Sequence, residues 1–128
     1  MRHLAADSIL IEDGKILLIE RKFDPFKGSW AIPGGFLEEN ESLQECAIRE
    51  MHEETGLSTV PYCLVGIYSD PKRDPRGVVA AAYLVRKVGG TLKASSDAKS
   101  TKWFDLNSLP KMAADHLSII EDAIKKLD

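Results

Sequence analysis

The stretch GFLEENESLQECAIREMHEETGL, residues 35–57, decides the fold of this chain. Residues 42–55 within it contain neither glycine nor proline, and their apolar side chains recur at the spacing of one helix face: Leu43, Cys46, Ala47 and Met51. This periodicity predicts a helix over 42–55. Gly56 follows at once, where a glycine commonly ends a helix. The stretch therefore reads as a loop, a helix and a second loop.

The same stretch concentrates the acidity of the chain. The 128 residues carry 17 Lys and Arg against 20 Asp and Glu, a formal net charge of −3. Residues 35–57 hold seven glutamates and one strong base, Arg49, so they carry −6 and leave +3 for the remainder. The acidic charge belongs to one place, and the remainder can present a basic rim to an anionic ligand.

Three of these glutamates share one face of the predicted helix. Glu50, Glu53 and Glu54 stand at positions i, i+3 and i+4, where like charges come within reach and repel one another. A hard divalent cation would offset that repulsion, and oxygen donors without Cys or His favour Mg²⁺ or Mn²⁺. The alternative, from these residues alone, is a solvated acidic helix face.

The order and spacing of the fixed residues resemble the Nudix box, the signature of the Nudix hydrolase family. The matching positions are Gly35, Glu41, Arg49, Glu50, Glu53, Glu54 and Gly56, with Met51 and Leu57 as the bulky apolar ones. The resemblance implies an α/β fold of the Nudix type, an α/β/α sandwich with a mixed β-sheet between helices. It implies one domain over residues 1–128, with the Nudix box at 35–57.

The resemblance also implies roles for particular residues. Arg49 and Glu41 are expected to tie the loop to the helix and to orient the catalytic face. An arginine behind metal ligands holds them in place, which makes this role physically sensible. The implied ligands of Mg²⁺ or Mn²⁺ are the backbone carbonyl of Gly34 and the carboxylates of Glu50, Glu53 and Glu54.

The general base has more than one candidate. Glu53 or Glu54 can serve while also contacting metal. Many Nudix relatives use a carboxylate from a loop before the last strand, and Asp97 in the segment SSDA, residues 95–98, stands where they often read Asp-Glu-Ala. Asp97 is therefore expected to be a further ligand or base, with a plain loop aspartate as the alternative.

The rest of the chain predicts further strands and one more helix. Apolar runs predict strands at 4–11, 15–20, 62–68, 78–85 and 101–104. Asp13-Gly14 between the first two is a hairpin signal, and the run at 78–85 is continuous enough for a central strand. Residues 111–127 predict a helix with one apolar stripe, formed by Leu117, Ile120, Ile124 and Leu127.

Composition excludes several classes of protein. The chain is 44% hydrophobic and 29% charged, as in a globular domain, and its acidic balance gives no support for nucleic-acid binding. Its longest apolar run, 78–85, is too short for a membrane span, and residues 1–14 lack the apolar core of a signal peptide. Two cysteines are too few for a disulfide framework. We expect a cytoplasmic protein, and the predicted sheet edges leave room for a homodimer.

Two loops bear on the substrate. The segments RKFDPFKGSWAIPGG, residues 21–35, and SDPKRDPRG, residues 69–77, resemble the entry segment and substrate loop of the ADP-ribose pyrophosphatase-like group. Val78 follows the second segment, where many members carry His. The expected substrate-binding residues are Arg21, Trp30, Arg73 and Arg76. The alternatives are a solvated rim for the arginines and a core position for Trp30.

The leading hypothesis is metal-dependent hydrolysis of a nucleoside diphosphate derivative, with ADP-ribose giving AMP and ribose 5-phosphate. In this family metal-activated water attacks one phosphorus and a phosphate leaves. A MutT-like pyrophosphohydrolase of nucleoside triphosphates, oxidised ones included, is the second hypothesis. The third comes from another class: a module that binds ADP-ribose as a sensor without cleaving it.

Overall fold

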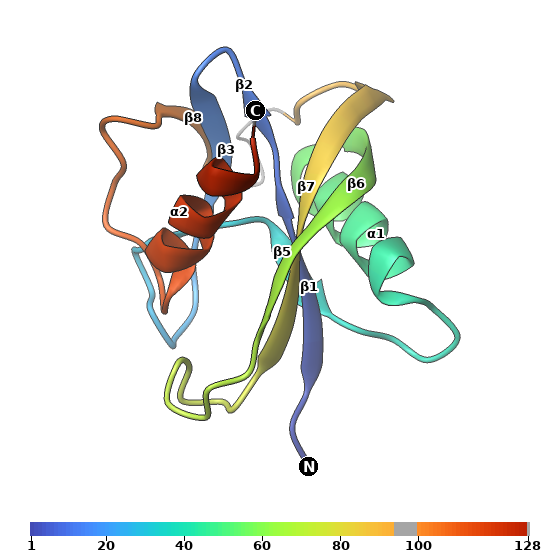
Figure 1. Cartoon of the computed structure of the whole chain (residues 1–128), viewed down its shortest axis with the longest axis vertical. Coiled ribbons are helices and arrows are strands. Elements are labelled where there is room, and N and C mark those ends of the chain that lie inside the picture. Colours follow the sequence, from blue (N-terminus) through green and yellow to red (C-terminus); the bar gives the residue numbers. More distant parts are fainter. Residues whose placement is uncertain (94–99, 128) are drawn as a thin grey trace.

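Residues 1–93 and 100–127 are described by the structure, a computed structural model. Their strands form two sheets (Figure 1). The first sheet has the order β5 (Gly34–Phe36), β1 (Leu4–Ile9), β7 (Val79–Gly90) and β6 (Leu57–Tyr68). The pair β1 and β7 is parallel, whereas the other neighbours are antiparallel, so this sheet is mixed.

The second sheet is built around β3 (Lys15–Glu20). Strand β8 (Thr101–Asp105) pairs antiparallel with β3, and β2 (Ile11–Glu12) and β4 (Trp30–Ala31) pair antiparallel with its two ends. The predicted hairpin at Asp13-Gly14 is confirmed between β2 and β3. Both turn residues have positive φ, 52° and 75°, which a two-residue hairpin loop of this kind requires.

The predicted strand over 4–11 is wrong in one respect, because it is two strands in different sheets. β1 ends at Ile9, and β2 begins at Ile11. Ile9 and Leu10 are both fully buried, and they belong to different apolar clusters. A continuous apolar run can be buried on both of its faces, so the sequence carries no mark of the point where the chain passes between sheets.

Helix α1 (Leu43–Thr55) begins and ends as predicted. Ser42 and Glu45 form a capping box: the Glu45 N–H donates to Ser42 Oγ at 3.1 Å, and the Ser42 N–H donates to Glu45 Oε1 at 2.8 Å. Gly56 ends the helix in the left-handed region, with φ of 84°. The capped helix buries Cys46, Ala47, Met51 and Thr55.

Helix α2 (His116–Lys126) begins later than the predicted start at 111, and its buried face overlaps the predicted stripe only in part. Ile120 is buried and Leu127 packs against the same cluster, whereas Leu117 is 46% exposed and Ile124 40% exposed. The residues that the helix buries are Ile119, Ile120 and Ala123. Adjacent apolar residues permit two phases of the helix, and only the surface beneath selects one.

One helix lies on either side of the strands (Figure 1). Strand β7 lies between β1 and β6, which confirms the predicted central strand, and α1 packs over one apolar cluster with Leu10, Leu17 and Met51. A second cluster joins Ile16 and Leu18 to Ile119 and Ile120 of α2. The predicted α/β architecture, a mixed sheet between helices, is confirmed. Among the described residues no helix is long and apolar enough to cross a membrane.

Candidate active site

Two glycines bring the β5 backbone close to the helix and to β1. A Cβ placed on Gly35 would lie 2.3 Å from Cδ of Glu50, and one placed on Gly34 would lie 2.1 Å from Oδ1 of Asp7. Real Cβ atoms do not approach other atoms this closely. The absence of a side chain at both positions therefore allows the loop to pass directly against two carboxylates.

Arg49 joins this loop to α1. Its Nε and Nη2 donate to the two carboxylate oxygens of Glu41 at 3.0 and 2.8 Å, and Nη2 also donates to the Phe36 carbonyl at 3.1 Å. Its Nη1 donates to Glu50 at 3.0 Å and to Glu53 at 3.2 Å. Hydrogen bonding from Arg49 lowers the pKa of Glu41 to about 2. The arginine thus fixes the loop and two of the predicted metal ligands at once.

The three predicted metal-binding glutamates lie on one face of the helix but point in two directions. Glu50 and Glu53 turn toward Arg49, whereas Glu54 accepts a hydrogen bond from the Gly34 N–H at 2.9 Å. Among residues 1–93 and 100–127, no three acidic, His or Cys side chains are grouped as a metal site. The donor chemistry nevertheless fits Mg²⁺ or Mn²⁺, since every candidate ligand is an oxygen.

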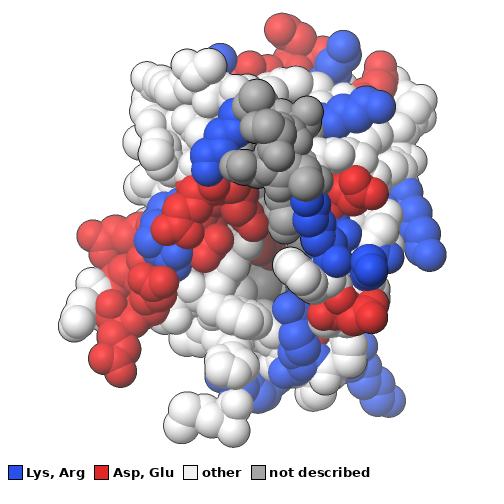
Figure 2. Space-filling view, turned by 180° about the vertical axis from the view of Figure 1, so that it is seen from behind, with Lys and Arg blue, Asp and Glu red and all other residues white. Residues whose placement is uncertain are grey.

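The glutamates also differ in their exposure. The Glu50 side chain is 17% exposed and that of Glu53 is 58% exposed. Burial raises the pKa of Glu50, and the nearby Arg49 opposes that shift. Figure 2 shows the largest group of acidic side chains on the left of this face and most Lys and Arg side chains on the right, where further acidic side chains lie among them. The acidic charge is therefore concentrated on one side of this face without being confined to it.

A cleft of about 140 Å³ adjoins this acidic helix. Glu54, Gly34 and Gly35 line the side toward α1. Much of its wall is apolar: Ala5, Ile19, Phe26, Ala31, Ile32, Phe36, Val78, Ala80, Ala113 and Ala114. Its remaining polar residues are Asp7, Arg21, Arg73, Asp74, Arg76 and His116. The cleft thus brings a carboxylate of the helix and three arginines to one opening.

Arg73 lies in this wall with its donors already engaged. Its side chain is 4% exposed. Nε and Nη2 donate to Asp115 at 2.9 and 2.7 Å, and Nη1 donates to the Val78 carbonyl at 3.0 Å. Arg73 therefore holds the loop before β7 against the start of α2, and its predicted contact with substrate stays a prediction.

Two other predicted substrate-binding residues, Arg76 and Arg21, also donate hydrogen bonds within the protein. Arg76 donates to the Asp74 carboxylate at 2.8 and 3.0 Å and lies 5.6 Å over the Phe36 ring, with its side chain 37% exposed. Arg21 donates to the backbone carbonyl of Pro25 at 2.7 Å. Both line the cleft, as expected of residues that bind an anionic substrate.

The remaining candidates lie away from these contacts. Trp30 packs edge-on against Phe104 with ring centroids 4.8 Å apart and joins the core cluster beside α2, the position that the sequence left as its alternative. Asp97, the candidate for a further ligand or base, lies outside the described residues.

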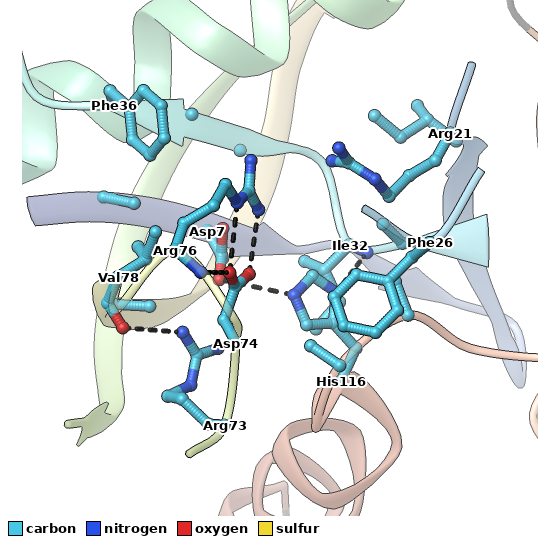
Figure 3. Close-up of a pocket in the computed structure, with 18 of the residues that line it drawn as sticks. Asp7, Arg21, Phe26, Ile32, Phe36, Arg73, Asp74, Arg76, Val78 and His116 are labelled. Atoms are coloured by element: carbon cyan, nitrogen blue, oxygen red, sulfur yellow. Dashed lines mark hydrogen bonds and ion pairs between the residues drawn. The ribbon is translucent and has the colours of Figure 1, made fainter. Parts of the chain in front are cut away.

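Sequence reasoning missed two residues of the cleft, Asp7 and His116. The Ile32 N–H donates to His116 Nδ1 at 2.9 Å, and His116 Nε2 lies 4.0 Å from Asp7 Oδ2 (Figure 3). Burial raises the pKa of Asp7 to about 7 and lowers that of His116 to about 4. A signal existed for one of them, because Asp7 is the only charged residue in the apolar run 4–11.

A mixed sheet between helices, with an arginine-braced row of glutamates beside a cleft, defines a class of α/β enzyme that works on anionic substrates. The chain belongs to the NUDIX domain family, whose sequence profile matches residues 1–123. The predicted family and the predicted enzyme class, a Nudix hydrolase, are confirmed.

Two of the proteins that this chain resembles are ADP-ribose pyrophosphatases. The chain is 50% identical over 123 residues to an ADP-ribose pyrophosphatase of Methanocaldococcus jannaschii, an alignment that covers 95% of this chain and 73% of that one. It superposes on the crystal structure of an ADP-ribose pyrophosphatase from Streptococcus suis with a TM-score of 0.76, at 25% identity and with 97% and 89% of the two chains covered.

A third similar protein was crystallised with a nucleotide and a metal ion. It is a bifunctional NMN adenylyltransferase/ADP ribose pyrophosphatase from Francisella tularensis, complexed with AMP and a manganese ion. The TM-score is 0.80 at 28% identity, and the match covers 98% of this chain and 42% of that one.

Proposed function

We propose that this chain hydrolyses ADP-ribose to AMP and ribose 5-phosphate with the help of Mg²⁺ or Mn²⁺. The observation that carries the proposal is the cleft that Glu54 shares with Arg21 and Arg76. A diphosphate needs cations to bind it and a carboxylate surface to hold the metal that activates water. Identity of 50% with an ADP-ribose pyrophosphatase over nearly the whole chain supports this choice of substrate.

The residues that would hold the metal are Glu50, Glu53, Glu54 and the carbonyl of Gly34. A bound Mg²⁺ or Mn²⁺ supplies charge neutralisation at the diphosphate and lowers the pKa of a bound water. Arg49 keeps Glu50 and Glu53 in place through its hydrogen bonds. Such bracing orients ligands that would otherwise repel one another.

The chain's own residues contribute binding and proton transfer. Arg76 and Arg21 present guanidinium groups to the cleft, and these suit the oxygens of a diphosphate. Glu54 borders the cleft, so its carboxylate can take a proton from an attacking water; Glu53 and Asp97 are further candidates for this base. The apolar part of the lining, which includes Phe26 and Phe36, restricts water around the substrate, which strengthens each charged contact.

The proposal extends to the setting of the enzyme. We infer a small-molecule substrate and a cytoplasmic location, consistent with two free cysteines. A homodimer formed through a sheet edge stays a prediction.

A panel of diphosphates tests the proposed function. Purified protein with Mg²⁺ or Mn²⁺ is expected to release AMP and ribose 5-phosphate from ADP-ribose, with both products identified by chromatography. Pyrophosphate released from nucleoside triphosphates, with ADP-ribose untouched, would assign the chain to the MutT-like alternative. Tight binding of ADP-ribose with no turnover would instead support the sensing module.

A further inference from the structure

We propose that Arg2 is a positioning residue for the substrate: by joining the two ends of the loop at 69–77, it holds Arg76 at the cleft in the orientation that binds the diphosphate. The inference rests on the proposed function, because it takes Arg76 as a residue that binds this diphosphate. Arg2 itself is not among the described residues that line the cleft, so its effect on the substrate has to pass through the loop.

Arg2 spans the two ends of this loop. Strands β6 and β7 pair as far as Tyr68 and Ala80, and the loop between them begins just beyond this point. Arg2 Nη2 donates to the Ser69 carbonyl at 2.7 Å, and Nε donates to the Gly77 carbonyl at 2.8 Å. One planar guanidinium therefore bridges the ends of the loop where the pairing of the strands has stopped.

The backbone beside Arg2 belongs to the sheet, which gives the bridge a fixed support. Arg2 lies two residues before Leu4, the first residue of β1, and Leu4 is in register with Val79 of the parallel strand β7. The Val79 N–H also donates to the His3 carbonyl at 2.9 Å. The side chain of Arg2 therefore holds the loop from a backbone that is itself hydrogen-bonded to the sheet.

Gly77 follows Arg76 directly, and its backbone is the one that most needs restraint. It has a φ of 71°, and glycine has more conformational freedom to lose than any other residue. The hydrogen bond from Arg2 to its carbonyl limits that freedom. Without Arg2 the loop would sample more conformations, and the apparent affinity for substrate would fall with the fraction of molecules in which Arg76 is in place.

A second contact from the same segment reaches Arg76 by way of Phe36. The His3 ring stacks on the Phe36 ring with centroids 5.1 Å apart, and the Arg76 guanidinium lies 5.6 Å over the Phe36 centroid. Figure 3 shows Arg76 between Phe36 and Asp74, which accepts two hydrogen bonds from it. Arg2 and His3 thus support both the loop that carries Arg76 and the ring that it contacts.

A double-mutant cycle with Arg76 tests this role. Arg2→Met keeps an unbranched side chain without a donor and is expected to raise KM for ADP-ribose about five- to tenfold, with kcat within about twofold of the wild type. In the Arg76→Gln background, Arg2→Met should raise KM by less than about twofold, because both residues act through one contact. Arg2→Lys keeps the charge without the planar fork, so its KM should lie between those of the wild type and Arg2→Met.

Amide hydrogen exchange gives a second readout, which needs no substrate. In Arg2→Met the amides of residues 70–77 should exchange at least about threefold faster than in the wild type, whereas those of β3 should keep their rates. Arg86→Met serves as the matched control. It removes an exposed arginine in the far half of β7, where the guanidinium lies over the Tyr62 ring, and it should change neither loop exchange nor KM.

Three results would each overturn the proposal. Unchanged exchange of the loop amides in Arg2→Met would show that Arg2 does not hold the loop. Additive effects on KM in the double variant would show that Arg2 acts independently of Arg76. A wild-type KM in Arg2→Lys beside a raised KM in Arg2→Met would show that charge alone matters. Absence of ADP-ribose cleavage by the wild type is a separate result, which bears on the proposed function, and the exchange measurement still decides whether Arg2 holds the loop.

Discussion

Arg49 donates two hydrogen bonds to Glu41, from Nε to Oε2 at 3.0 Å and from Nη2 to Oε1 at 2.8 Å, across the loop that leads into α1. The same guanidinium reaches Glu50 and Glu53 through Nη1. The loop and the glutamate face are therefore held by one side chain. A substitution at Glu41 should therefore change the positions of Glu50 and Glu53, although Glu41 contacts them only through Arg49.

The first prediction concerns this linkage. Glu41→Gln removes the charge that anchors Arg49, so the arginine can shift toward Glu50 and Glu53 and compete with metal there. We expect kcat to fall at least tenfold and the Mg²⁺ concentration for half-maximal rate to rise, as measured by metal titration of the rate. Glu39→Gln, on the same loop and exposed, should change neither value. Equal behaviour of the two variants would show that Arg49 needs no anchor.

The second prediction concerns the carboxylates themselves. Glu54→Gln keeps an oxygen that can accept the Gly34 N–H, so the melting temperature should stay within a few degrees of the wild type. Glu53 is 58% exposed, so Glu53→Gln should also fold. Turnover should fall by 10² or more in at least one of the two, the range for loss of a catalytic acid or base. Wild-type rates in both variants would refute the proposed role of this face.

The third prediction separates two adjacent glycines. At Gly34 a methyl group would meet backbone atoms, the Ala6 carbonyl oxygen at 2.5 Å and the Asp7 Cα at 3.0 Å. At Gly35 the three nearest atoms all belong to the Glu50 carboxylate, the end of a flexible side chain that can turn away at the cost of its hydrogen bond from Arg49. Gly34→Ala should therefore lose about 2–4 kcal/mol of unfolding free energy in urea melts, whereas Gly35→Ala should lose activity with a smaller loss of stability. The reverse order would contradict the contacts described.

The fourth prediction concerns stability and pH. The pKa of Asp7 is raised from 3.8 to about 7, so the folded state binds an extra proton there and its contribution is lost as pH rises from 4 to 7. The pKa of His116 is lowered from 6.5 to about 4, so its contribution is lost as pH falls from 6.5 to 4. In the wild type these two slopes oppose each other.

Single variants should expose each slope. Relative to the wild type, the unfolding free energy of Asp7→Asn should rise between pH 4 and pH 7, and that of His116→Gln should fall between pH 4 and pH 6.5. The change is on the order of 3 kcal/mol in each case, from a shift of several pKa units at a buried site. Denaturant melts across this pH range measure it. Parallel curves for all three proteins would show that neither group titrates differently on folding.

Local signals made α1 and its site readable from the sequence. The capping residue Ser42, the helix-ending Gly56 and the spacing of Arg49 from Glu41 all lie within one short stretch. The pairing of Asp7 with His116 joins residues 109 positions apart. It depends on β1 and α2 lying on either side of the cleft, and no local spacing of residues in the sequence predicts that arrangement.

The phase of α2 was unreadable for a related reason. Ile119 and Ile120 are adjacent, so the apolar pattern fits a stripe through Leu117 and Ile124 as well as the face that is buried. Arg73 shows the same limit at the site. Its loop suggested contact with substrate, whereas Asp115, 42 positions away, takes two of its donor groups.

The last prediction tests what Arg73 does. Because its buried guanidinium is paired with Asp115 and with the Val78 carbonyl, both Arg73→Gln and Asp115→Asn break one partnership and should each cost roughly 2–4 kcal/mol of unfolding free energy. The double variant should cost little more than either single one, because both remove the same pair. At a temperature where all variants stay folded, KM for the diphosphate should rise similarly in both, since each releases the loop that carries Arg76. A KM that rises only in Arg73→Gln would instead show that Arg73 contacts the substrate directly.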